Sequence, residues 1–235
     1  MSTTPTIVLV HGAFGDSGMW KGVIARLQAQ GYSTLAVPNP LRGLESDAQY
    51  AATVTRAVDG PVVLVGHSYA GAIITRAARD ASNVEALVYV AAFQPDEGES
   101  CLENASRFPG AKMGPDTTVA TEYEGEPELR ILPAHYRDVI AGDLPAEVTD
   151  VLAVTQRSVR VQALTAELSG TPAWRTLPSW AAVATQDNAI PARAQEFMAE
   201  RAGSHVVRME ASHAVAVSQP DAVADLIIEA AKTTG

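Results

Sequence analysis

Residues 62–71, VVLVGHSYAG, place a serine between a buried strand and a helix, and no other stretch constrains the fold as strongly. The run 62–65 is apolar and rich in β-branched residues, as in a strand that is buried on both faces. A helix-forming run follows at 72–79. A strand that turns into a helix within so few residues must bend sharply, and small residues on both sides of Ser68 permit the bend. The sequence therefore predicts a serine hydroxyl held at the carboxyl end of a strand, beside a helix N-terminus.

This arrangement is that of a nucleophile elbow, whose common pattern is G-x-S-x-G. Here the second small position is Ala70, and Gly71 follows one residue later. We expect alanine to fit, because the bend requires a small side chain at this position. A glycine-rich turn between a strand and a helix can also bind phosphate. The rest of the chain distinguishes the two interpretations.

Buried strands alternate with amphipathic helices on both sides of this stretch. Strands are predicted at 7–10, 32–37, 62–65, 86–90, 180–184 and 205–209. Helices are predicted at 19–30, 46–58, 72–79, 191–201 and 220–232. Near-continuous apolar strands separated by helices indicate a parallel sheet covered on both faces. The expected fold class is α/β, with a doubly wound, mostly parallel six-stranded sheet.

The alternation stops between residues 96 and 170, where we find no pattern of a buried parallel strand. This segment is predicted to hold a loop at 107–115, a hairpin of 117–122 with 128–132, and amphipathic helices at 144–157 and 158–168. A long insertion of this kind is more often a functional lid than slack chain. We therefore expect residues 1–95 and 171–235 to form the core, with residues 96–170 as an inserted cap.

Length and composition limit the class of protein. The chain has 235 residues, 47% of them hydrophobic and 19% charged, as expected for one sizeable globular core. Its formal net charge of −10 argues against nucleic acid or an anionic membrane surface as a partner. The single cysteine, Cys101, excludes an internal disulfide. No apolar run approaches the ~18 residues of a membrane helix, and no signal peptide is recognised, so we expect a cytoplasmic location.

Three polar residues follow predicted strands in the order that serine hydrolysis on such a sheet requires. A serine hydroxyl needs an adjacent base, usually a histidine that a carboxylate orients. Reactive groups in a parallel α/β sheet lie beyond the carboxyl ends of the strands. Ser68, Asp187 and His213 follow the third, fifth and sixth strands. We predict that Ser68 is the nucleophile, that His213 is the base and that Asp187 orients it.

The four remaining histidines fit the role of base less well because of their places in the predicted sheet. His11 lies before a glycine-rich loop, and His67 lies inside the bend and points away from Ser68. His135 lies in the insertion, and His205 lies at the start of the last strand. Among the acids, Asp96 is the rival of Asp187, since it also follows a strand.

The oxyanion that forms on attack requires preorganised N–H donors. One is expected from Tyr69, directly after the nucleophile, and the second from the loop after the first strand. That loop is 11–18, HGAFGDSG, in which Ala13 is the candidate and Phe14 the alternative. It lacks the G-x-G-x-x-G and G-x-x-x-x-G-K-[ST] spacings of phosphate-binding loops.

The chain resembles the small bacterial α/β-hydrolases that are related to the plant esterase/hydroxynitrile-lyase group. The resemblance is carried by His11-Gly12-Ala13 with Trp20, the GHSYAG bend, residues 172–180, Asp187, Ile190-Pro191 and Ser212-His213. It spans nearly all of the chain and is weakest at 110–135. It implies a serine esterase without a cofactor, with a cap over the site and a sheet that lacks the first two strands of larger relatives. It also implies Ser68, Asp187 and His213 as the triad, and Ala13 and Tyr69 as the oxyanion amides.

We therefore expect a carboxylesterase-type serine hydrolase that acts on esters of small, largely apolar molecules through an acyl-enzyme, without a metal. Candidates for the pocket lining are Phe14, Met19, Tyr69, Phe108, Met113 and Trp174. The alternatives are a hydroxynitrile-lyase-like C–C lyase and a non-catalytic receptor for a small ligand. In this group, lyases resemble the esterases but have threonine at the position of Gly12 and lysine directly after the histidine. Gly12 and Ala214 therefore favour ester hydrolysis, and the complete triad argues against a receptor.

Overall fold

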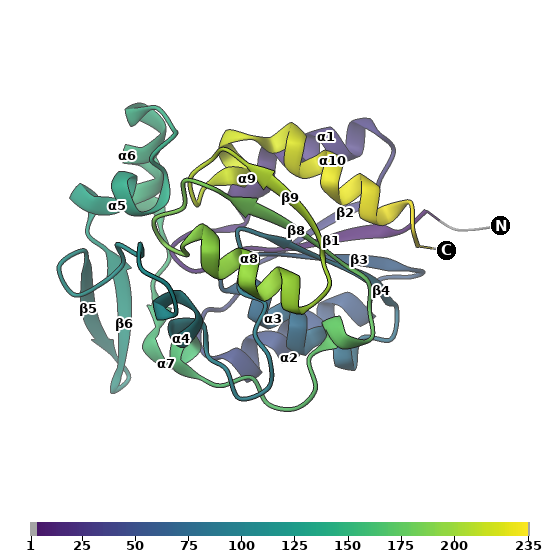
Figure 1. Ribbon diagram of the computed structural model, residues 1–235, viewed down its shortest axis with the longest axis horizontal. Helices are drawn as coiled ribbons and strands as arrows, with labels where there is room; N and C mark the ends of the chain where they lie inside the picture. The colour runs from purple at the N-terminus through teal and green to yellow at the C-terminus, as the bar shows by residue number, and fades with distance from the viewer. Residues whose placement is uncertain (1–3, 235) are drawn as a thin grey trace.

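A six-stranded sheet forms the centre of the molecule (Figure 1). The computed structural model describes residues 4–234. The strands are β1 (Thr6–Val10), β2 (Thr34–Val37), β3 (Val62–His67), β4 (Val84–Val90), β8 (Ser179–Ala184) and β9 (His205–Met209). They lie in the order β2-β1-β3-β4-β8-β9, and every neighbouring pair is parallel. The predicted α/β class with a doubly wound parallel sheet is confirmed.

Helices cover both faces of this sheet (Figure 1). One face carries α1 (Lys21–Ala29) and α10 (Pro220–Ala231), and the other carries α2 (Leu44–Arg56), α3 (Ala70–Ala77) and α8 (Ala192–Arg201). The remaining short helices of the core are η1 (Ser17–Trp20), η2 (Ala78–Asp80), η3 (Ala173–Arg175) and α9 (Val215–Ser218). Within residues 4–234, no helix has the length and apolar character to cross a membrane.

Side chains along the central strands alternate between the two helical layers. Ile7 and Val63 pack in the cluster that includes α1 and α10, whereas Val8 and Leu64 pack in the cluster that includes α2 and α3. All four side chains are fully buried. Because both faces of the sheet are covered at its centre, β1 and β3 are apolar along most of their length, whereas the edge strand β9 includes the exposed His205 and Arg208.

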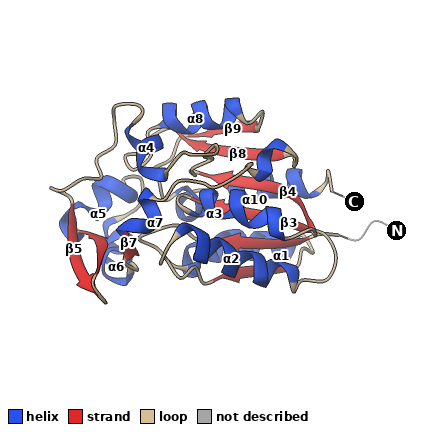
Figure 2. Ribbon diagram, turned by 90° about the horizontal axis from the view of Figure 1, so that it is seen from below, coloured by secondary structure: helices blue, strands red, loops and turns tan. Residues whose placement is uncertain are grey.

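The segment between β4 and β8 forms a second, antiparallel sheet with four helices. Its strands are β5 (Thr118–Tyr123), β6 (Glu126–Ile131) and β7 (Val159–Arg160), and its helices are α4 (Cys101–Ser106), α5 (Pro133–Ile140), α6 (Ala146–Thr155) and α7 (Val161–Thr165). Figures 1 and 2 place most of this segment at the end of the molecule opposite the two termini.

The predictions for this segment are partly wrong. The hairpin is confirmed, with Glu124 and Gly125 at positive φ in its turn. The single helix predicted at 158–168 is instead a short strand, which pairs with β6, followed by one helical turn and a half. Helices α4 and α5 were not predicted, although α4 begins with a capping box of Ser100 and Glu103 that is visible in the sequence.

A buried histidine ties the loop after β1 to the end of β2. His11 Nδ1 donates to the carbonyl of Gly12 (2.9 Å), and its Nε2 accepts from the N–H of Asn39 (3.0 Å). The side-chain amide of Asn39 donates a hydrogen bond to the carbonyl of His11 (2.9 Å). Burial lowers the pKa of His11 to about 4, so its ring is neutral at pH 7. This arrangement requires a neutral ring, because Nε2 must accept a hydrogen bond.

Helix α3 lies very close to the chain that follows β4. A Cβ atom at Gly71 would overlap the carbonyl oxygen of Phe93 and lie 2.9 Å from the Cβ of Ala92. A Cβ at Gly66 would lie 2.6 Å from the carbonyl oxygen of Ala70. The closest approach therefore falls at Gly71, one residue beyond the alanine that departs from the common elbow pattern.

Replacing Gly71 with alanine should destabilise the fold. The added methyl group meets backbone that cannot rotate away, and overpacking of this kind costs about 1–3 kcal/mol. Urea denaturation of Gly71→Ala should show this loss in the free energy of unfolding. The matched control is Gly114→Ala, because a Cβ there meets no atom within 4 Å. Equal stability of the two variants would contradict this account of the packing.

The neutral ring of His11 should make the fold sensitive to acid. An unfolded histidine has a pKa of about 6.5, so between pH 6.5 and about 4 the unfolded chain binds a proton that the folded chain does not. The free energy of unfolding therefore falls as the pH falls through this window, by up to about 3 kcal/mol from this group. The variant His11→Gln should lose this part of the pH dependence in denaturation curves between pH 7 and 4. Parallel pH dependences in the two proteins would contradict the prediction.

Candidate active site

Ser68 lies at the bend between β3 and α3 with its backbone in the left-handed region (φ 55°). Non-glycine residues rarely adopt this conformation. The N–H of Ser68 donates to the carbonyl of Val90 (3.2 Å), and its carbonyl accepts from Gly71 (2.9 Å) and Phe93 (3.1 Å). These bonds to the helix and to the end of β4 hold the strained backbone in place.

Asp187 and His213 form a buried pair beyond the ends of β8 and β9. His213 Nδ1 lies 2.7 Å from Asp187 Oδ2. The same oxygen accepts from the side-chain amide of Gln195 (2.8 Å). The other oxygen, Oδ1, accepts from the N–H groups of Ala189 (2.7 Å) and Ile190 (2.8 Å). A carboxylate can only accept here, so Nδ1 of His213 donates to it, and Nε2 is the ring nitrogen left to exchange a proton with another group.

Gln195 was not predicted from the sequence, but it contacts the Asp187–His213 pair through Asp187. It lies on α8 and bonds the carboxylate of Asp187, the carbonyl of Ile190 (2.8 Å) and the N–H of Ala184 (3.1 Å). It therefore links the end of β8, the loop after it and the helix that follows. No sequence motif marks it, because its role depends on how α8 packs over that loop.

The rival carboxylate, Asp96, lies elsewhere. It accepts from Arg175 (2.6 Å) and from the N–H of Glu97 (2.9 Å). Of the two acids that follow strands, the structure brings only Asp187 to His213.

His67 holds the backbone of His213. Its Nε2 donates to the carbonyl of His213 (2.8 Å), and the two ring centres are 4.7 Å apart. Burial lowers the pKa of His67 well below its usual value, so the ring is neutral. Its Nδ1 is buried and finds no hydrogen-bond partner within residues 4–234. This supporting role, on the side away from Ser68, was not predicted.

Three backbone N–H groups near Ser68 are available as donors. Within residues 4–234, no protein atom accepts from the N–H of Tyr69, Ala13 or Phe14. Phe14 has positive φ (58°), and its carbonyl accepts from the hydroxyl of Tyr136 (3.0 Å). A Cβ at Gly12 would lie 2.6 Å from the Cβ of Ser68, so the loop after β1 passes directly against the bend.

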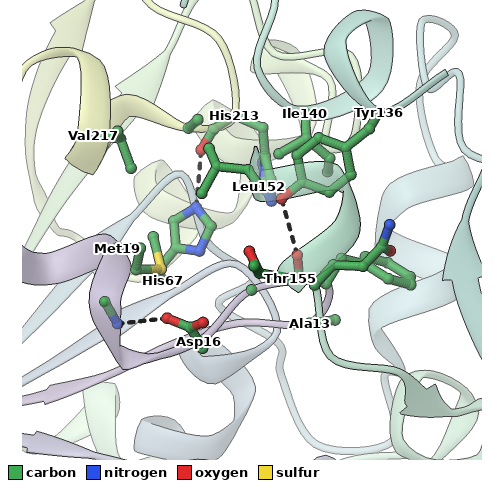
Figure 3. Close-up of a pocket in the computed structure, with 15 residues that line it drawn as sticks. Ala13, Asp16, Met19, His67, Tyr136, Ile140, Leu152, Thr155, His213 and Val217 are labelled. Carbon is green, nitrogen blue, oxygen red and sulfur yellow. Dashed lines mark hydrogen bonds between the residues drawn. The ribbon is translucent and has the colours of Figure 1, made fainter. Parts of the chain in front are cut away.

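Two cavities meet at this point. One of about 20 Å³ is lined by Ser68 and by Phe93, Met113 and Ile190, and we call it the serine cavity. The other, of about 270 Å³, is lined by Met19, His67, Tyr136, Leu152 and Val217, and we call it the Met19 cavity (Figure 3). Both are lined by Ala13, Phe14, Ile140 and His213. Within the described part of the chain, no group of three or more His, Cys, Asp or Glu residues is placed to hold a metal ion.

The predicted lining residues divide into two groups. Phe14 lines both cavities, Met19 lines the Met19 cavity and Met113 lines the serine cavity. The others line neither cavity and are engaged in packing elsewhere (Tyr69, Phe108 and Trp174).

Each of these three aromatic residues has partners away from the cavities. The Tyr69 hydroxyl donates to Asp47 (2.9 Å) on α2. Phe108 packs edge-to-face against Phe197 with ring centres 5.9 Å apart. The indole of Trp174 donates to the carbonyl of Pro95 (2.9 Å). Hydrophobicity alone did not distinguish such packing residues from lining residues.

Comparison with known proteins agrees with this architecture. The chain is 27% identical over 252 residues to the alpha/beta hydrolase nvfD of Aspergillus novofumigatus, covering 97% of this chain and 96% of that protein. It is 26% identical over 251 residues to the putative methylesterase 11, chloroplastic, of Arabidopsis thaliana, covering 97% of this chain and 64% of that protein. The crystal structure of the methylesterase MES16 from Arabidopsis aligns with a TM-score of 0.81 at 19% identity, covering 97% of this chain and 99% of that one.

The sequence also matches the alpha/beta hydrolase family over residues 7–226, from β1 into the last helix. This match includes all six strands of the central sheet from Ile7 onward, and the residues that line the two cavities. The chain therefore belongs to the alpha/beta hydrolase family.

Proposed function

We propose that the protein hydrolyses carboxylic esters of small, largely apolar molecules, with Ser68 as the nucleophile. The observation that carries this proposal is the convergence of three groups. Ser68 and His213 line one cavity, and His213 is bonded to Asp187 at 2.7 Å. In this arrangement His213 can act as the base for the hydroxyl of Ser68, and the carboxylate of Asp187 can orient His213.

In the first half of the reaction, Ser68 Oγ attacks the ester carbonyl carbon and its proton passes to Nε2 of His213. The carbonyl oxygen becomes an oxyanion and accepts hydrogen bonds from the N–H of Tyr69 and from that of Ala13 or Phe14. The bond to the alcohol oxygen then breaks, and this oxygen takes the proton from His213. The products of this half are the free alcohol and an acyl group on Ser68.

In the second half, a water molecule attacks the acyl carbon and gives a proton to His213. The tetrahedral intermediate collapses, the bond to Ser68 Oγ breaks, and His213 returns the proton to that oxygen. The carboxylic acid leaves. Asp187 stabilises the imidazolium that forms in each half. No step requires a metal or a cofactor.

The comparisons support the ester class. The relative from Arabidopsis and the structural neighbour are both named methylesterases.

The location of the reaction inside the cell is part of the same proposal: we expect a cytoplasmic enzyme.

Two features weigh against the lyase alternative. A side chain at Gly12 would collide with the Cβ of Ser68 at 2.6 Å, so the threonine of the lyases does not fit this loop as it stands. Ala214 follows His213 where the lyases have lysine, and its N–H donates to the carbonyl of Ile140 (2.9 Å). We therefore favour hydrolysis over cleavage of a carbon–carbon bond.

Removing the nucleophile should abolish turnover without unfolding the protein. We expect Ser68→Ala to lower kcat for p-nitrophenyl acetate by roughly three decades or more, as removal of a triad residue does. Thermal unfolding should change little, because alanine keeps the backbone of the bend. Ser46→Ala, at an exposed position on α2, is the control and should retain full activity.

A fluorophosphonate probe separates an enzyme from a receptor on the same fold. It should label the wild-type protein at Ser68 in a time-dependent way and leave Ser68→Ala unlabelled. Near-wild-type turnover by Ser68→Ala would show that another group is the nucleophile.

The acid should act through the histidine. In Asp187→Asn, the new amide N–H cannot accept from His213 Nδ1, so the ring is driven to the wrong tautomer. We expect kcat to fall by up to ~10⁴. Asp96→Asn is the matched control, because its carboxylate pairs with Arg175 instead. A larger loss of kcat in Asp96→Asn than in Asp187→Asn would show that Asp96, and not Asp187, is the carboxylate that acts through the histidine.

A further inference from the structure

An apolar groove runs along the segment between β4 and β8. Its volume is about 450 Å³, and its walls come from α4, the loop at 113–115, β5, β6 and α7. We call it the β5–α7 groove. Every residue that lines it is uncharged, in a chain whose formal net charge is −10. An uncharged surface groove of this size is a binding feature more often than a packing defect.

The groove adjoins the serine cavity. Leu102, Met113 and Leu164 line both, so they form a neck between Ser68 and the surface. Leu164 is buried, whereas Leu102 is 49% exposed. The exposure of this large apolar side chain is explained if a ligand covers it.

The serine cavity alone is too small for most ester substrates. Its volume of about 20 Å³ corresponds to one or two water-sized spheres. An acyl group longer than a few atoms therefore has to extend into one of the two spaces beside this cavity, the Met19 cavity or the β5–α7 groove.

The acyl side of the ester is the side that faces this neck. In the acyl-enzyme the acyl carbon is bonded to Ser68 Oγ, and Ser68 lines the serine cavity but not the Met19 cavity. The leaving alcohol takes its proton from His213, which lines both. The alcohol is thus expected in the larger Met19 cavity, and the acyl chain in the serine cavity.

From these observations we infer that the β5–α7 groove binds the far end of an extended, uncharged acyl chain. This inference rests on the proposed function and narrows its substrates to esters of medium-chain or longer apolar acids. The three lining residues that the groove shares with the cavity of Ser68 are what identify the occupant as part of the substrate.

The test is the dependence of kcat/KM on acyl length. We expect p-nitrophenyl octanoate and decanoate, used below their aggregation concentrations, to react with higher kcat/KM than the acetate and butyrate. Each methylene that becomes buried raises kcat/KM by up to about fourfold. Octanoic acid should also inhibit hydrolysis of the acetate ester competitively.

Strand β5 offers a matched pair of variants. Ala120 lines the groove and pairs with Leu129, which also lines it, whereas Val119 pairs with the exposed Arg130. Side chains alternate along a strand, so Val119 faces away from the groove. Ala120→Trp should fill the groove and lower kcat/KM for the octanoate by about tenfold or more, with the acetate unchanged. Val119→Trp should change neither.

Thr118 lines the same groove two residues earlier on β5. The variant Thr118→Phe should also fill the groove, and it replaces Ala120→Trp in the test if that variant does not fold. The inference is overturned if the wild type shows no gain beyond butyrate. It is also overturned if both tryptophan variants act alike, or if Ala120→Trp lowers the rates of all esters equally. These outcomes leave the proposed function intact, provided that acetate hydrolysis still requires Ser68. Loss of the proposed function would instead appear as ester turnover that Ser68→Ala does not affect.

Discussion

The site depends on one strained residue, because the backbone of Ser68 adopts a left-handed conformation that costs about 1–3 kcal/mol for a residue with a side chain. Two hydrogen bonds to its carbonyl and one from its N–H offset this cost. The bend also requires close approach from neighbouring chain. Gly12, Gly66 and Gly71 are positions at which a side chain would collide with the bend or with the backbone beside it.

Hydrogen bonds from two parts of the molecule fix the position of His213. From the core, His67 donates to its carbonyl, and Asp187 accepts from its ring. From the segment between β4 and β8, the carbonyl of Ile140 accepts from the N–H of Ala214 (2.9 Å) and from the hydroxyl of Ser212 (3.1 Å). The residues on both sides of His213 are therefore bonded to α5. The packing of α5 therefore affects the position of His213, and α5 is not a lid that can move independently of that residue.

The sequence predicts the central sheet well because its signals are local and repeated. A strand such as 62–65 is apolar at each position since both faces are covered, and the turn at 66–71 restricts what can follow it. The order of Ser68, Asp187 and His213 then follows from the parallel topology, which brings the ends of their strands to one edge. Residues whose roles depend on distant packing were not predictable in this way. Gln195 lies in no motif, and the GHSYAG bend that contains His67 does not reveal its hydrogen bond to His213. The indole N–H of Trp174 likewise donates to Pro95, 79 residues earlier in the chain.

The segment between β4 and β8 leaves and re-enters the core at one point. Gly98 N donates to the carbonyl of Leu168 (2.9 Å), and Leu168 N donates to the carbonyl of Glu99 (2.9 Å), so its two ends are bonded to each other. The Glu99 carboxylate is clamped by Arg201 of α8 (2.6 and 2.8 Å). Burial opposes the charge on Glu99, but the bonds from Arg201 and from the N–H of Asp96 outweigh it and lower its pKa to about 2.

A segment fastened at its base to α8 and at Ile140 to the loop of His213 has no free hinge at either point. Opening it as a rigid lid would break the Glu99–Arg201 ion pair or the hydrogen bonds between Ile140 and the residues on both sides of His213. Ligand access is therefore better explained by the cavities themselves than by movement of the whole segment. The Met19 cavity and the neck at Leu102 and Met113 provide routes from two sides that leave His213 in place. Under the proposed function, the acyl and alcohol parts of an ester would be separated by the side chains that line the serine cavity and the Met19 cavity, while the backbone around His213 stays fixed.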